Sequence, residues 1–240
     1  MTGQAPTASI VAFYGPDKPR PLTDLVAVLQ ADLAERIGPA LLPRPLDAVH
    51  STLVGLDVLG PVAWPDTSGS GRLVAPEGVD LAGFARHLRT ELDREPVTLQ
   101  LGGFPDRDLG VTSRGRRLHE RSLTADRGQL VLVGWPVDPL GSPVATLDRL
   151  RRDARPFGIA HRYHRDAADI DADAHLVLAE LAPSVPPAAL DDALAAGRTA
   201  LAGRAHRVPL RWEDLRVVLY DDPRLPLATT VVLPMAAIGG

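Results

Sequence analysis

Apolar residues recur with two different periods along the chain, and these periods predict alternating strands and helices. Short apolar runs predict strands at residues 9–14 and 48–56. Between them, apolar residues recur at every fourth position, which is helical spacing, at Leu25, Leu29, Leu33 and Ile37. Gly38-Pro39 ends this pattern. The stretch 60–78 is rich in Pro, Gly and Ser and has no period, so we interpret it as a loop insertion.

The rest of the chain repeats this order of elements. Asp80 is a candidate N-cap for a helix whose apolar positions are Leu81, Phe84, Leu88 and Leu92. Ser142-Pro143 resembles a second N-cap with proline at the first helical position, and Pro187 opens a third helix. Further strands are predicted at 97–104, 130–135, 175–181, 215–220 and 229–233. We therefore expect one α+β domain over residues 1–240, with two successive lobes of antiparallel or mixed sheet and flanking helices.

Composition narrows the class of protein. The chain has no cysteine, which excludes disulfides and thiolate metal sites and fits a reducing compartment. No apolar stretch approaches about 18 residues, and residues 1–9 do not resemble a signal peptide, so we expect a cytoplasmic protein without a membrane partner. The net charge of -4 argues against strong non-specific binding to polyanions. A local basic cleft is still compatible with this net charge, because eight arginines are concentrated in the middle of the chain: Arg114, Arg116, Arg117, Arg121, Arg149, Arg151, Arg152 and Arg155.

The segment His50-Ser51-Thr52 contains the first candidate site residues. Strand alternation places His50 and Thr52 on one face, about 7 Å apart, with Ser51 on the other. An imidazole that moves a proton beside a hydroxyl that donates to an oxygen is suited to a phosphate. A half-buried histidine beside a β-favouring threonine would produce the same pattern.

His175 opens another apolar strand, 175 − 50 = 125 residues later. Two histidines on facing strands can serve as general base and general acid on either side of one phosphorus atom. The alternative is that His175 merely begins a strand.

These two segments resemble the H-x-[T/S]-hydrophobic motifs of the 2H phosphoesterase superfamily, which includes RNA ligase-like and cyclic phosphodiesterase families. His50-Ser51-Thr52-Leu53 matches fully, whereas His175-Leu176-Val177-Leu178 has valine at the hydroxyl position. The element order resembles the family over nearly the whole chain. The resemblance implies two pseudo-symmetric lobes around a central cleft and no metal or other cofactor.

The resemblance also implies roles for individual residues. His50 and His175 would be the acid/base pair, both titrating near neutrality, and Thr52 would bind phosphate. Val177 cannot donate a hydrogen bond, and one such contact is worth about 2.7–4 kcal/mol in comparable sites. Arg162, Tyr163 and His164 lie upstream and are candidates to supply the missing phosphate contact.

The segment around these three residues has other interpretations. In one, His164 and not His175 is the second functional histidine; in the other, the whole segment is an exposed polar loop. Four aspartates follow His161-x-x-His164 without a recognised ligand spacing, so we expect a solvated acidic loop and not a metal site: Asp166, Asp169, Asp171 and Asp173.

Together these features predict a metal-independent phosphoesterase that acts on a 2′,3′-cyclic phosphate or on a 2′-linked nucleotide or RNA end. A non-catalytic nucleotide or RNA-end binding protein on the same scaffold is the alternative, because Val177 departs from the motif. An unrelated α+β domain with two coincidental histidine strands is a third.

Overall fold

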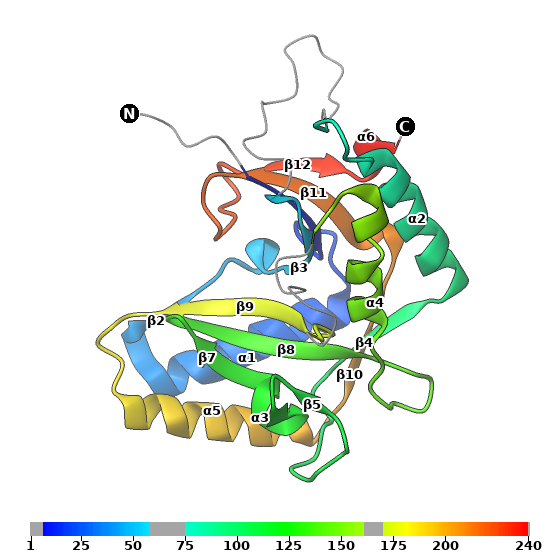
Figure 1. Ribbon diagram of the computed structural model, residues 1–240. Helices are drawn as coiled ribbons and strands as arrows, with labels where there is room; N and C mark the ends of the chain where they lie inside the picture. The colour runs from blue at the N-terminus through cyan, green and yellow to red at the C-terminus, as the bar shows by residue number, and fades with distance from the viewer. Residues whose placement is uncertain (1–6, 58–74, 161–169, 240) are drawn as a thin grey trace.

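Two antiparallel sheets and the helices around them make up the fold, which is α+β (Figure 1). The computed structural model describes residues 7–57, 75–160 and 170–239. One sheet has the strand order β12-β11-β1-β3. Its strands are β1 (Thr7–Ala12), β3 (Ser51–Gly55), β11 (Leu215–Tyr220) and β12 (Val231–Pro234).

The second sheet is larger and has the order β10-β4-β8-β9-β2, with β7 also paired to β8. Its strands are β2 (Leu41–Pro43), β4 (Val97–Leu101), β7 (Leu123–Asp126), β8 (Gln129–Val137), β9 (Ala174–Leu181) and β10 (His206–Leu210). A separate two-residue hairpin consists of β5 (Thr112–Ser113) and β6 (Arg116–Arg117).

The pairing of the strands corrects the expected order of the lobes. β1 pairs with β3 on one side and with β11 on the other, so the first sheet joins the two ends of the described chain. The expectation of two successive lobes is therefore wrong. Hydrophobic periodicity identified most of these strands, but it carries no information about which strand lies beside which, because pairing is set by tertiary packing.

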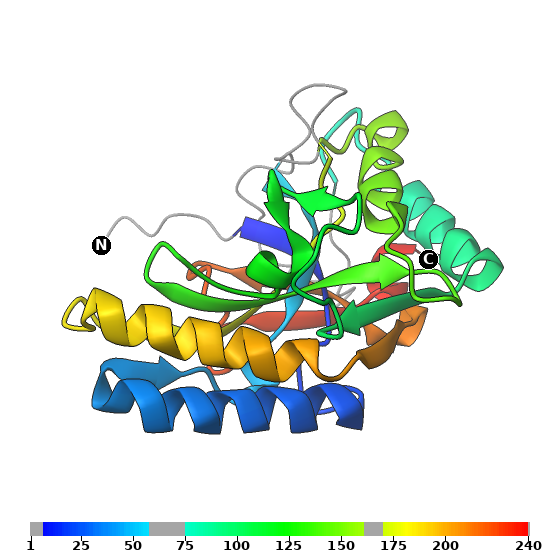
Figure 2. The same cartoon turned by 90° about the horizontal axis from the view of Figure 1, so that it is seen from below.

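Two long helices cover the larger sheet and lie side by side in Figure 2. They are α1 (Arg20–Ile37) and α5 (Pro187–Ala202). On the opposite side of the molecule α2 (Leu81–Arg94) packs against the short C-terminal α6 (Ala236–Gly239), with α4 (Thr146–Arg152) nearby (Figure 1). The remaining helix, α3 (Leu118–Ser122), leads directly into β7.

The two predicted N-caps have opposite outcomes. Asp80 caps α2, since its carboxylate accepts a hydrogen bond of 2.7 Å from the backbone N–H of Gly83. Ser142-Pro143 does not begin a helix, because α4 starts three residues later at Thr146. Instead the backbone N–H of Ser142 donates to Asp138 in a turn, and Pro143 pairs with Val137.

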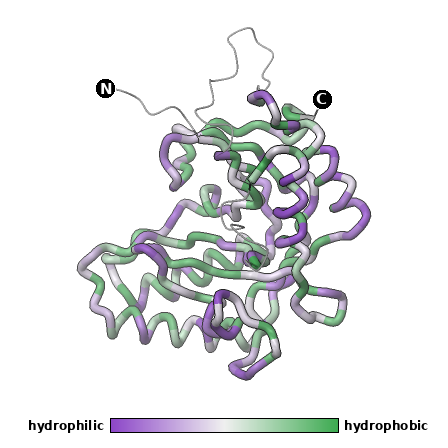
Figure 3. The backbone as a smooth tube through the Cα atoms, in the orientation of Figure 1, coloured by the Kyte–Doolittle hydropathy of each residue, from purple (hydrophilic) through white to green (hydrophobic). Residues whose placement is uncertain are grey.

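One continuous hydrophobic cluster connects both sheets with α1, α2 and α5. Leucine, valine and alanine make up most of it, as the scarcity of aromatic residues predicts. Figure 3 shows the hydrophobic stretches along the strands and the hydrophilic ones along the loops and the outer side of α2. Each fully buried aliphatic side chain contributes roughly 1.5–3 kcal/mol, so this shared core fixes how the sheets lie relative to each other. No helix in the described part of the chain is long and apolar enough to cross a membrane.

Candidate active site

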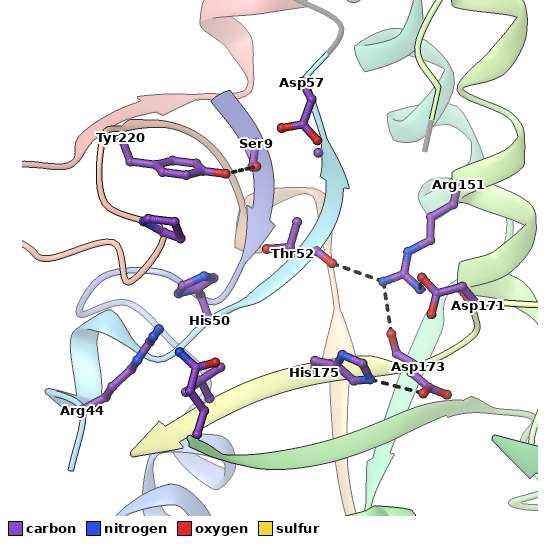
Figure 4. Close-up of a pocket in the computed structure, with 14 residues that line it drawn as sticks. Ser9, Arg44, His50, Thr52, Asp57, Arg151, Asp171, Asp173, His175 and Tyr220 are labelled. Carbon is purple, nitrogen blue, oxygen red and sulfur yellow. Dashed lines mark hydrogen bonds and ion pairs between the residues drawn. The ribbon is translucent and has the colours of Figure 1, made fainter. Parts of the chain in front are cut away.

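A cavity of about 320 Å³ lies between the two sheets, and both predicted histidines line it (Figure 4). β3 is the edge strand of the smaller sheet and lies close to β9 of the larger one. Thr52 on β3 and Val177 on β9 also face the cavity, so the structure brings the two motifs together. Arg162, Tyr163 and His164 lie outside the described residues, as does most of the expected insertion at 60–78.

His50 has a defined tautomer. It follows a 3₁₀ turn (Leu46–Ala48), and its Nδ1 lies 2.8 Å from the carbonyl oxygen of Ala48. Since a carbonyl only accepts, Nδ1 carries the proton and donates, and Nε2 keeps a lone pair. The ring also makes an edge contact with Tyr14, at 5.7 Å between ring centroids. His50 is therefore held in the form that a general base requires.

The surroundings of His50 keep it neutral. Burial lowers its pKa to about 4, the hydrogen bond to Ala48 opposes this shift, and the positive charges of Arg44 and Lys18 add to it. The expectation that both histidines titrate near neutrality is thus wrong for His50. Sequence patterning placed the ring in a cleft but did not reveal the two cations beside it.

Thr52 fulfils the predicted alternation along β3. Its side chain is exposed to the cavity, whereas Ser51 is buried on the other side of the strand. The carbonyl of Thr52 accepts from Arg151, while its hydroxyl makes no hydrogen bond to any described residue. That hydroxyl is available to a ligand oxygen.

His175 is oriented by a buried carboxylate. Its Nε2 lies 3.2 Å from Oδ2 of Asp173 and 3.3 Å from Nη2 of Arg121. Asp173 also accepts from the hydroxyl of Ser113 at 2.6 Å, from the indole Nε1 of Trp135 at 2.7 Å and from Arg121 at 3.2 Å. Burial alone would raise the pKa of Asp173, but the hydrogen bonds from His175 and Ser113 outweigh it and hold that pKa well below its usual range.

Arg151 connects the two histidine segments. Its guanidinium donates to the carbonyls of Leu53 (2.9 Å) and Thr52 (3.2 Å) on β3. It also donates to the carbonyls of Asp171 (2.6 Å) and Asp173 (3.1 Å) just before β9 and pairs with the carboxylate of Asp171 at 3.3 Å. Figure 4 shows the guanidinium between Thr52 on one side and Asp171 and Asp173 on the other. One buried cation therefore links the strand that follows His50 to the segment that leads to His175.

One sequence expectation fails at this point. Asp171 and Asp173 are not solvated, because both are buried and bound to Arg151. Of the eight arginines concentrated in the middle of the sequence, Arg151 lines the cavity, and Arg121 is buried against Asp173. No group of three or more candidate metal ligands occurs among the described residues, and His161 and His164 lie outside them.

The strands that carry the two histidines share an irregularity at the same motif position. Leu53 has no partner in the pairing of β3 with β1, and Leu178 has none in the pairing of β9 with β8. Each is a β-bulge residue that lies three positions after the histidine of its strand. Bulges bend a strand and re-aim the neighbouring side chains.

Long side chains bind the carbonyl of each bulge residue. Arg151 donates to Leu53, and Gln30 of α1 donates to Leu178 at 2.7 Å. Leu178 also accepts from the backbone N–H of Arg44 at 2.8 Å. The two motifs thus share a local backbone geometry although the second lacks the hydroxyl.

Several cavity residues escaped the sequence analysis. Arg44 is the most notable, since its side chain is only 7% exposed and Nη2 contacts Glu180 at 3.0 Å. Its Nε is buried without a hydrogen-bond partner in the described structure. Tyr220 and Ser9 line the cavity as well, with 2.9 Å between their hydroxyl oxygens. These residues belong to no local motif, and their convergence arises from strand pairing alone.

Comparisons with known proteins do not identify the chain. No protein-family model matches it, and no curated protein does. Among solved structures, a conserved protein of unknown function from Agrobacterium tumefaciens is similar with a TM-score of 0.44 and 15% identity. That match covers 91% of this chain and 82% of the other.

Removing the side chain of Arg151 should destabilise the folded protein. We expect Arg151→Met to lower the free energy of unfolding by about 3–5 kcal/mol, because it removes the buried cation that pairs with Asp171 and the donor that four carbonyls share. Arg155→Met, at an exposed position nearby, should stay within about 0.5 kcal/mol of wild type. Urea unfolding at pH 7 measures both. Similar values for the two variants would contradict the role given to Arg151.

His50 should make stability depend on pH in a defined window. The pKa of His50 is about 4 in the folded protein and has its ordinary value of 6.5 in the unfolded chain, so the unfolded chain binds the proton first as the pH falls. Stability from this residue is complete above about pH 6.5 and is lost as the pH falls towards 4. Thermal unfolding should show a weaker loss between these pH values in His50→Gln than in the wild type. Parallel curves for wild type and His50→Gln would contradict this assignment.

Proposed function

We propose that this protein is a metal-independent phosphoesterase that acts on 2′,3′-cyclic phosphates or on 2′-linked nucleotide or RNA ends. The observation that carries the proposal is the placement of His50 and His175 in one cavity, on two strands with the same bulge. This likeness of the motif geometry supports a pseudo-symmetric 2H arrangement of the site.

In this proposal His50 is the general base. Its Nε2 takes a proton from water, whose oxygen forms a bond to phosphorus. The fixed tautomer suits this role, because Nε2 keeps a free lone pair at neutral pH, while the low pKa makes the ring a weaker base than an ordinary histidine. Burial of the ring beside Arg44 and Lys18 keeps this base form populated down to about pH 4.

His175 is then the general acid. One ester P–O bond breaks, and the leaving oxygen takes the proton from Nδ1 of His175 while Nε2 stays against Asp173. Asp173 provides the counter-charge for the doubly protonated ring, as a buried carboxylate does for other catalytic histidines. The product is a phosphomonoester, and the proton balance closes when water re-equilibrates the two rings.

Thr52 and Arg44 are the proposed phosphate-binding residues. The Thr52 hydroxyl donates to a non-bridging oxygen, as the first motif implies. Val177 offers no donor, but the guanidinium of Arg44 lines the same cavity and provides a positive charge for the anion. Arg44 thereby replaces part of the phosphate stabilisation that a hydroxyl at position 177 would provide.

A non-catalytic binding protein is the second candidate, and Val177 favours it. A missing transition-state donor in comparable sites slows chemistry roughly a hundredfold or more without preventing binding. The same cavity would then hold a nucleotide or RNA end without turnover.

Turnover of adenosine 2′,3′-cyclic phosphate separates the two candidates. We expect His50→Ala and His175→Ala each to lower kcat about 10²–10⁴-fold, because each removes one proton-transfer group. His87→Ala, outside the cavity, should retain wild-type activity. Measured binding without any wild-type turnover would favour the binding protein. If wild type neither binds nor cleaves a panel of cyclic nucleotides and RNA ends, the proposed function is wrong.

A further inference from the structure

A second hollow, of about 540 Å³, lies beside the candidate active site. One wall comes from β2 and the residues after it, with Leu42, Pro43 and Pro45. The other comes from the connection between β11 and β12, with Pro226 and Leu227. Figure 1 shows β2 and this connection on the same side of the molecule. We call this hollow the apolar groove.

The apolar groove exposes large hydrophobic side chains to water. Leu42 is 57% exposed and Leu227 is 47% exposed, one on each wall. Contiguous exposed apolar surface with a polar rim is typical of a binding site. The rim here consists of charged residues, because Asp222 and Arg224 pair at 2.6 Å and Glu180 lies against Arg44.

Arg44 joins the apolar groove to the active-site cavity, since it lines both. Its side chain is more than nine-tenths buried, and its Nε has no hydrogen-bond partner among the described residues. Ala48 provides a second connection: it lines the groove, and its carbonyl binds Nδ1 of His50. A ligand whose phosphate lies at His50 therefore has the groove directly beside it.

We infer that the apolar groove binds the nucleobase of the substrate, with the phosphate held at Arg44 and His50. This inference rests on the proposed function. A base has two flat faces that fit between aliphatic walls, and polar edges that fit a charged rim. The carboxylate of Glu180 already accepts from Arg44 and Gln129 and has a second oxygen that can accept from an amino group on a base edge. The groove is thus a specificity site for the group attached to the ribose.

Calorimetric binding of two phosphates tests the inference. The probes are adenosine 2′-monophosphate and methyl riboside 2-phosphate, which lacks the base. Wild type should bind the nucleotide about tenfold more tightly, because the aliphatic walls remove the apolar faces of the base from water. Leu227→Asp and Leu42→Asp place a carboxylate on either wall and should remove this preference while leaving the affinity for the riboside phosphate unchanged. Leu140→Asp, at a 90% exposed leucine outside the groove, is the matched control.

The outcomes separate the inference from the proposed function. One set of results would show that the groove assignment alone is wrong. In it both phosphates bind, Thr52→Val weakens the binding of both, and the two groove variants keep the preference for the base. The same holds if wild type shows no preference for the base. If neither phosphate binds wild type, or if Thr52→Val changes nothing, the proposed function falls and the inference falls with it.

Discussion

Arg151 places a full positive charge between two sheets, where water does not solvate it. Four backbone carbonyls and one carboxylate compensate that charge, two carbonyls from the strand of His50 and the rest from the segment before His175. Moving such an ion out of water costs free energy, and a nearly complete set of hydrogen bonds and ion pairs is needed to offset this cost. The partners of Arg151 are consequently fixed in space, and the two histidine strands with them. Everything proposed for the cavity depends on this constraint.

The environments of the two histidines differ. Burial and the charges of Arg44 and Lys18 keep His50 neutral, and the hydrogen bond to a carbonyl leaves the lone pair on its Nε2. Nε2 of His175 lies close to both a buried carboxylate, that of Asp173, and the guanidinium of Arg121. The proposed mechanism assigns the base to His50 and the acid to His175, with Asp173 as the counter-charge, so the two histidines move protons in opposite directions. The two motifs share the position of the bulge, but they differ in the hydroxyl residue and in their surroundings.

Local sequence was sufficient for most of the elements and for the alternation at the first histidine. The alternation at His50 and Thr52 and the helical spacing from Leu81 to Leu92 express local periodicity, and the structure confirms both. Pairing of β1 with β11 was not predictable, because it depends on contacts between distant segments. Asp173 resembled part of an acidic loop for the same reason: its partners Arg121 and Trp135 lie 52 and 38 residues away. Arg44 carried no local signal, because its place in the cavity follows from the pairing of β2 with β9.

The central claim is that His50 and His175 act on the same phosphate from two sides of one cavity. A crystal structure of the protein with adenosine 2′-monophosphate tests it most directly. We expect phosphate oxygens about 3 Å from Nε2 of His50, from the Thr52 hydroxyl and from Nδ1 of His175, with Arg151 still bound to β3 and to the segment before β9. A phosphate bound outside the cavity, or in contact with only one of the two histidines, would contradict it.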